Sequence, residues 1–153
     1  MNANAPLSKT LPGTWTLVSR VIRSASGHAV PSALGDDPIA LLIYDDAGNF
    51  AAQFMRRDRS GVDSPEDAAA TPSGANNSRV IGGYDAYFGR YSIDDAAGTV
   101  TQTLVGSLSP DNVGQVLTRE MRVDGDRLTI DVATTTPAGE PATIILVWRR
   151  ATA

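Results

Sequence analysis

The first predicted strand opens with Leu11-Pro12-Gly13-Thr14-Trp15-Thr16-Leu17-Val18, and the last one ends with Leu146-Val147-Trp148-Arg149-Arg150. Residues 14–23 are rich in Thr, Val, Leu and Ile, which is typical of a β-strand. The indole of Trp15 is a large apolar group and should point inward. A Gly-x-Trp entering the first strand and an arginine leaving the last suggest a sheet whose two ends meet, which is a closed barrel.

The remaining sequence supplies seven further strand patterns, separated by turns rich in Gly and Asp. They cover residues 39–44, 49–57, 86–94, 99–108, 115–123, 127–135 and 142–150. Short turns join strands two to three, four to five, six to seven and seven to eight, so these pairs should be antiparallel neighbours. The pattern favours an all-β, eight-stranded antiparallel up-and-down barrel with a central cavity, and a Greek-key sandwich is the alternative.

The chain of 153 residues fits one domain. Residues 1–10 are small and polar, and we expect a flexible tail there, followed by one barrel domain over residues 11–153. Two long segments, 24–38 and 58–78, are rich in Gly, Pro, Ser and Asp and predict loops at the mouth of the barrel. The second loop is either a functional flap or a disordered insertion.

Composition excludes several classes of function. The net charge of −4 argues against nucleic acid and against an anionic membrane surface as partners. The absence of Cys and the presence of a single His exclude thiolate and multi-histidine metal sites, and no phosphate-loop or dinucleotide-binding motif is present. We therefore expect no cofactor and no metal. With no signal-peptide pattern at its start, the chain is expected to be cytoplasmic, and nothing indicates its oligomeric state.

The inward faces of the predicted strands are mostly apolar, with phenols and indoles interleaved, as in small-molecule sites. The candidate substrate-binding residues are Tyr44, Gln53, Phe54, Tyr91, Leu117, Met121 and Trp148. The candidate catalytic residues are Tyr87, Arg119 and Gln102. A hydrophobic or aromatic small molecule is the expected partner.

The direction of Arg119 is open, because Thr and Glu flank it. If it shares the face of Leu117 and Met121, it points inward and needs an anionic or carbonyl partner. The alternative is a structural salt bridge with Asp58 or Glu120.

The other polar candidates also have structural alternatives. Tyr87 either packs in the core or donates a hydrogen bond to a developing oxyanion, or acts as a general acid. Gln53 and Gln102 either orient a carbonyl or hydroxyl or are ordinary satisfied amides. His28, in the first loop, is either exposed or catalytic.

Taken in order, these pieces resemble the bacterial lipocalin-like domain family, from about Leu11 to Arg150. The resemblance rests on seven short stretches: residues 13–19, residues 42–44 with 46–48, Gln53 with residues 56–59, and residues 87–91, 106–110, 125–128 and 147–150.

The resemblance implies a lipocalin or calycin-type barrel with a ligand-sized interior. In that fold, the Gly-x-Trp tryptophan packs at the closed end under an arginine of the last strand, which here matches Trp15 with Arg149 or Arg150. Similar barrels also occur as cofactor-free isomerases, cyclases and lyases. One departure is in the fifth strand, where such domains often carry a His pair and this chain has Gln102-Thr103. In this chain, neutral hydrogen bonding by Gln102 would replace proton transfer by those histidines.

Three functions fit these observations. The first is a cofactor-independent enzyme of the isomerase, cyclase or lyase type, acting on an apolar or aromatic substrate held in the cavity. The second is a carrier for a hydrophobic small molecule, which needs only the cavity and its mouth. The third is a barrel with a filled core and no ligand. A titratable group with a perturbed pKa inside the pocket would favour the enzyme over the carrier.

Overall fold

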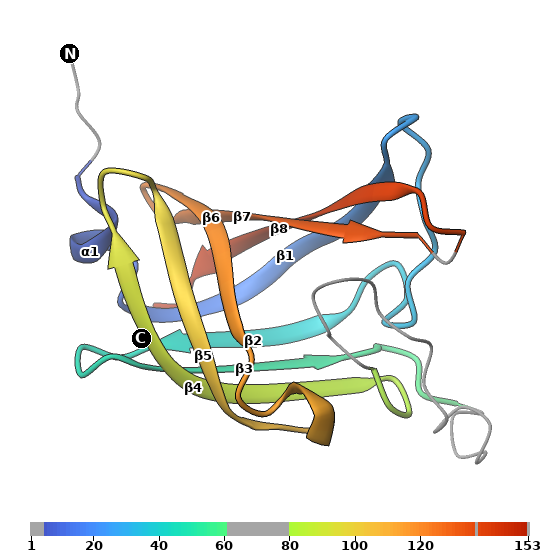
Figure 1. Ribbon diagram of the computed structural model, residues 1–153, viewed down its shortest axis with the longest axis horizontal. Helices are drawn as coiled ribbons and strands as arrows, with labels where there is room; N and C mark the ends of the chain where they lie inside the picture. Colours follow the sequence, from blue (N-terminus) through green and yellow to red (C-terminus); the bar gives the residue numbers. More distant parts are fainter. Residues whose placement is uncertain (1–4, 61–79, 137, 153) are drawn as a thin grey trace.

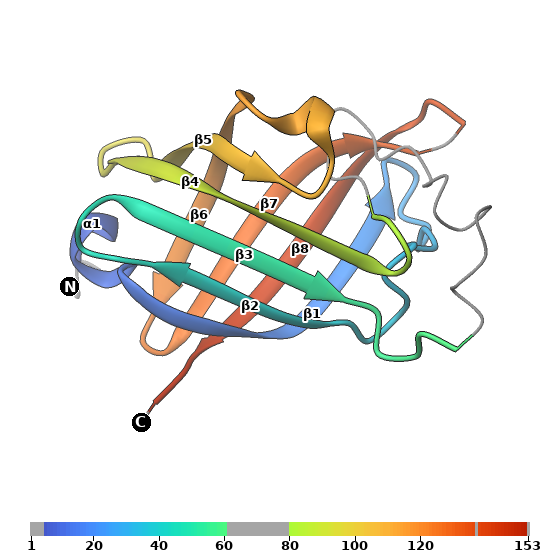
Figure 2. The same ribbon diagram turned by 90° about the horizontal axis from the view of Figure 1, so that it is seen from below.

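The computed structural model describes residues 5–60, 80–136 and 138–152, and they form one closed antiparallel barrel. A short helix α1 (Leu7–Thr10) precedes the strands, and a 3₁₀ turn η1 (Pro110–Asn112) lies between β5 and β6. The strands are β1 (Gly13–Ser24), β2 (Ile39–Tyr44), β3 (Asn49–Met55), β4 (Tyr84–Asp94), β5 (Thr99–Ser107), β6 (Val116–Asp124), β7 (Arg127–Thr135) and β8 (Pro141–Arg150). Each strand pairs with the next, and β8 pairs with β1 (Figures 1 and 2). The predicted up-and-down barrel is confirmed.

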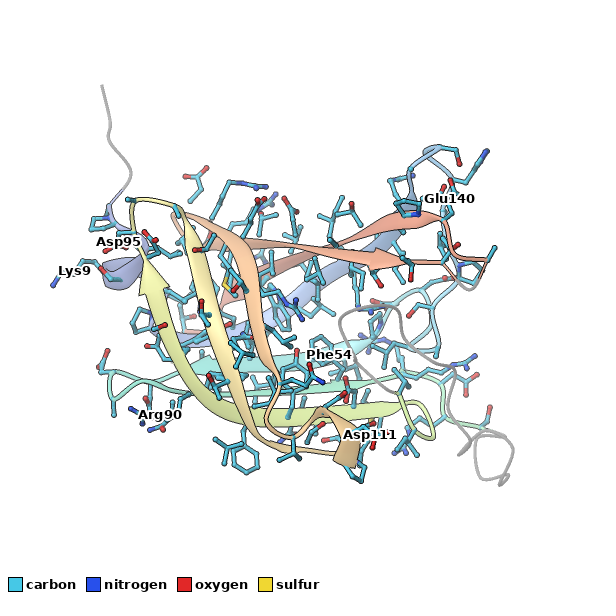
Figure 3. All side chains as sticks on the ribbon, viewed as in Figure 1. Lys9, Phe54, Arg90, Asp95, Asp111 and Glu140 are labelled. Atoms are coloured by element: carbon cyan, nitrogen blue, oxygen red, sulfur yellow. The ribbon has the colours of Figure 1, made fainter. Side chains whose placement is uncertain are left out.

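Period-two alternation places the apolar side chains inside the barrel, because successive residues of a strand point to opposite faces. In β2 and β3 the buried residues alternate strictly with outward-facing ones. Tyr44 and Phe50 are paired in register and their rings lie 6.0 Å apart, while Phe54 lies in the barrel interior (Figure 3). The core is therefore a set of inward-facing side chains drawn from every strand.

One end of the barrel is closed by Trp15 and Arg150. The guanidinium carbon of Arg150 lies 4.2 Å from the centre of the fully buried Trp15 ring, a cation–π contact. Arg150 also donates hydrogen bonds to the carbonyls of Thr10 and Pro12, and the indole N–H of Trp15 donates to the carbonyl of Leu11 at 2.9 Å. The predicted contact with an arginine of the last strand is thus made by Arg150.

Gly13 is needed at this closed end for two reasons. Its φ of +139° is one that side-chain-bearing residues rarely adopt, and a Cβ there would lie 2.6 Å from a nitrogen of the Arg150 guanidinium. The glycine before Trp15 therefore makes room for the arginine that covers the indole.

The segment before β1 differs from the expected flexible tail over residues 1–10. Leu7–Thr10 form α1, and Leu7 is buried. Ser8 donates its backbone N–H and its hydroxyl to the carboxylate of Asp95 at 2.8 and 2.6 Å, which joins α1 to the β4–β5 turn. The helix α1 and the end of β8 both lie at this end of the barrel (Figures 1 and 2). Within the described residues, no helix is long and apolar enough to cross a membrane.

A bulge in β1 changes which residues face the interior. The pairing with β8 runs from Leu17 opposite Trp148 directly to Ser19 opposite Val147, so one extra residue is accommodated at Val18. Strict alternation would place Arg20 on the face opposite Trp15. After the bulge, Arg20 lines the interior instead, while Val18 is exposed.

The opposite end of the barrel is covered by the loop between β1 and β2, as expected for a loop at the mouth (Figure 1). Leu34 of this loop is only 2% exposed and lines the interior. Ser32 accepts a hydrogen bond at 2.7 Å from the guanidinium of Arg20. Most of the second predicted mouth loop, residues 61–78, lies outside the described residues.

Replacing Arg150 by Ala should lower the free energy of unfolding, because it removes the cation–π contact with Trp15 and two hydrogen bonds to backbone carbonyls. We expect a loss of about 2–4 kcal/mol. Urea denaturation measures it. Arg149→Ala is the matched control, since Arg149 is exposed on the same strand and should change stability by less than ~0.5 kcal/mol. Equal losses for both variants would contradict this account.

Candidate functional site

The barrel encloses a cavity between the Trp15 end and the β1–β2 loop. Its volume, taken as the space open to the centre of a water-sized sphere, is about 50 Å³. The residues lining it are Arg20, Leu34, Leu42, Tyr44, Phe54, Asp85, Tyr87, Gln102, Arg119, Met121, Ile130, Val132, Ile144, Leu146 and Trp148. Seven of the ten predicted site residues are among them: Tyr44, Phe54, Tyr87, Gln102, Arg119, Met121 and Trp148.

Tyr44 and Gln102 form a buried polar pair inside the barrel. The amide nitrogen of Gln102 donates a hydrogen bond to the Tyr44 hydroxyl at 2.7 Å, and that hydroxyl lies 3.8 Å from the sulfur of Met121. Burial raises the pKa of Tyr44 far above its ordinary value. The phenol therefore stays protonated, and Gln102 serves to orient it.

Asp85 is the most unusual residue of the site, and its carboxylate is 1% exposed. The backbone N–H of Ala86 donates a hydrogen bond to it, but its Oδ1 atom is buried without a partner among the described residues. Burial raises the pKa of Asp85 to about 6, although the nearby Arg20 guanidinium acts in the opposite direction. A carboxyl group with this pKa gains and loses a proton near neutral pH.

Two arginines project into the same cavity. Arg119 lies on the face shared with Met121, whereas Glu120 points to solvent and Asp58 accepts hydrogen bonds from Ser60. Burial lowers the pKa of Arg119 and that of Arg20, while Tyr87 acts in the opposite direction on each. The question of where Arg119 points is thus answered: it points inward. Arg20 was missed because the β1 bulge reverses its direction.

An aromatic wall completes the site. The Phe54 ring stacks on Tyr87 with centres 6.3 Å apart and meets Trp148 edge-on at 5.7 Å. Burial raises the pKa of Tyr87 to about 12, with a smaller contribution from Asp85. The Tyr87 phenol is therefore a neutral hydrogen-bond donor at physiological pH.

Three predicted substrate-binding residues lie outside the cavity lining. Gln53 points outward, and its amide oxygen accepts a hydrogen bond from the Tyr84 hydroxyl at 3.0 Å. Tyr91 meets the Tyr44 ring edge-on at 4.9 Å, but its hydroxyl donates to the Asp45 carbonyl at 2.5 Å. Leu117 is half-buried and packs against the core. Gln53 is thus an outer-face residue, and Tyr91 and Leu117 pack against the core.

Asp85 escaped the sequence prediction because the fourth strand was expected to begin at residue 86, whereas β4 begins at Tyr84. Alternation from Tyr87 back along β4 would have placed Asp85 on the inner face. His28 is exposed in the β1–β2 loop. Among the described residues, no group of three or more His, Asp or Glu side chains is arranged to hold a metal ion.

Replacing Asp85 by Asn should stabilise the fold at neutral pH. The pKa of Asp85 is about 6 in the fold, against an ordinary value of 3.8. The folded state therefore favours the protonated acid, and ionisation lowers stability as the pH rises from about 4 to 6. The variant should gain up to about 3 kcal/mol over the wild type above pH ~6, and this advantage should vanish near pH ~4.

Urea denaturation across this pH range measures the difference. Asp124→Asn removes an exposed carboxylate at the end of β6 and controls for the change in net charge. An advantage of Asp85→Asn that is the same at both ends of the pH range would contradict the raised pKa.

Comparison with known proteins gives one family match. In a search of solved structures, the chain is similar to bovine odorant binding protein in complex with a selenium-containing odorant, with 14% identity and a TM-score of 0.47 over 100% of this chain and 77% of that one. No curated protein matches the sequence. Residues 12–151 match the family described as the lipocalin-like domain. The chain belongs to the lipocalin-like domain family.

Proposed function

We propose that this protein binds a small, mainly apolar molecule inside its barrel. The observation that carries the proposal is the cavity itself, walled by aliphatic and aromatic side chains and supplied with a few converging polar groups. A barrel of eight strands is just wide enough either to be filled by side chains or to hold one small ligand. Here the interior retains a cavity of about 50 Å³, which supports a small ligand over a completely filled core.

The dimensions of the cavity limit the size of the ligand. Its volume of about 50 Å³ exceeds the ~10–15 Å³ that one water needs. An engineered apolar cavity that binds benzene has ~150 Å³, so a molecule of one ring would enter only if the side chains of Phe54, Tyr87 and Trp148 moved outward, and a long lipid chain would need still more space.

Filling the cavity should abolish binding. Val132 lines the cavity from β7, so Val132→Phe places a ring in the space that a ligand would occupy. The next residue, Ala133, points outward and is exposed, and Ala133→Phe adds the same side chain outside. We expect p-xylene to bind to the wild type and to Ala133→Phe with similar Kd in isothermal titration calorimetry, and to bind Val132→Phe at least tenfold more weakly. Equal affinities for all three proteins would place binding elsewhere.

Catalysis is the second candidate function, and the position of Asp85 favours it. A carboxyl group with a pKa of about 6 inside an apolar cavity is suited to general acid–base chemistry. Asp85 would take a C–H proton from the substrate and return it at another position, which is an isomerisation without cofactor. Tyr87, Arg119 and the Gln102–Tyr44 pair would polarise the neighbouring carbonyl group.

Proton exchange separates the enzyme from the carrier. Small ketones that bind to the protein are incubated with it in heavy water, and NMR follows deuterium incorporation or rearrangement. For an enzyme, Asp85→Asn should lower the rate at least 100-fold while binding is retained, and Tyr87→Phe, Arg119→Gln and Gln102→Leu should lower it as well. Binding without exchange above the background rate would leave the carrier function.

A further inference from the structure

Two buried polar atoms of the cavity wall have no hydrogen-bond partner among the described residues. They are Oδ1 of Asp85 and Nε1 of Trp148. Each residue is 1% exposed, and each lines the cavity. A buried polar group without a partner is costly to a protein, and such groups in native structures are few. One of these atoms is an acceptor and the other a donor, and both are found at the same cavity.

The two atoms belong to one part of the wall. Asp85 on β4 is the register partner of Phe54 on β3, and the Phe54 ring meets the Trp148 ring at 5.7 Å. Tyr87, two residues after Asp85 on the same face, stacks on Phe54. Phe54 is therefore the aromatic surface around which the acceptor and the donor are arranged.

The charges of the wall disfavour a cationic ligand. Two guanidinium groups, Arg20 and Arg119, and one carboxyl group, Asp85, line the cavity. Among the described residues that line the cavity, Asp85 is the acidic one, and burial removes most of the water around its carboxyl group. An ammonium ligand would lie among two like charges and would lose its hydration, which is unfavourable in a partly apolar cavity.

We propose that the ligand is a small neutral aromatic molecule with a hydroxyl or N–H group that donates to Oδ1 of Asp85 and an oxygen that accepts from Nε1 of Trp148. The inference rests on the proposed binding function and names the chemical class of the ligand. The aromatic ring of the ligand packs against the surface that Phe54, Tyr87 and Trp148 form together. The polar groups of the ligand supply the two hydrogen bonds that the described wall lacks.

Four single-ring probes test the proposal. p-Xylene is the apolar reference, p-cresol adds a hydroxyl donor, p-tolualdehyde adds an acceptor, and 4-methylbenzylammonium adds a cation. Calorimetry gives Kd for each probe with the wild type, Asp85→Leu, Asp85→Asn and Trp148→Phe. Leu removes the acceptor, Asn keeps an amide oxygen, and Phe keeps an aromatic wall without an N–H.

We expect Asp85→Leu to reduce the preference for p-cresol over p-xylene by about tenfold or more, and Asp85→Asn to retain part of it. Trp148→Phe should reduce the preference for p-tolualdehyde over p-xylene by about three- to tenfold. In ¹H–¹⁵N spectra, p-tolualdehyde should shift the indole N–H of Trp148. The Trp15 indole, bonded to the Leu11 carbonyl, is the internal control and should not move.

The outcomes separate the inference from the function on which it rests. If p-xylene binds and the preferences are the same in Asp85→Leu and Trp148→Phe as in the wild type, the cavity binds ligands but these atoms do not recognise them, and the inference is wrong. Tighter binding of 4-methylbenzylammonium than of p-cresol would also overturn it. If no probe binds to the wild type, the proposed function falls as well.

Discussion

The contact between Arg150 and Trp15 joins the first strand to the last, and it reinforces the backbone pairing of β1 with β8 that closes the sheet. Arg150 is the last residue of β8, and Trp15 is the third residue of β1. The guanidinium lies over the indole and also donates hydrogen bonds to the carbonyls of Thr10 and Pro12. One side chain of β8 therefore contacts both β1 and the segment that links α1 to it. A sheet closed in this way leaves neither β1 nor β8 with an unpaired edge.

Closure at one end has a consequence for the distribution of polar groups inside. At the Trp15 end the indole N–H is paired with the Leu11 carbonyl, and the Arg150 guanidinium is paired with the carbonyls of Thr10 and Pro12. The polar residues Arg20, Asp85 and Arg119 line the cavity instead, beneath the β1–β2 loop. Burying them costs free energy that an all-apolar filling would avoid. The fold therefore has one end that serves stability and a cavity whose polar lining does not.

Much of this arrangement follows from the sequence, because alternation with period two is a strong signal. It identified the eight strands, and the sequence predicted seven of the residues that line the cavity. The family resemblance implied a contact of Trp15 with Arg149 or Arg150, and Arg150 makes it. The failures have local causes. Arg20 turned inward because a bulge near Val18 shifts the register, and alternation contains no sign of such an insertion.

Two other differences come from strand ends and strand faces. The sequence prediction missed Asp85 because β4 begins two residues earlier than expected. Strand boundaries depend on pairing with neighbours that are distant in sequence. Gln53 was assigned to the site for its chemistry, although alternation with Phe54 already placed it on the outer face.

The hydrogen bond between Arg20 and Ser32 joins the mouth loop to the cavity wall. The same guanidinium that borders the interior also holds the β1–β2 loop, at 2.7 Å from the Ser32 hydroxyl. Any occupant that takes this N–H must compete with Ser32 for it. For a ligand that engages Arg20, occupancy of the barrel and attachment of the loop are then linked equilibria.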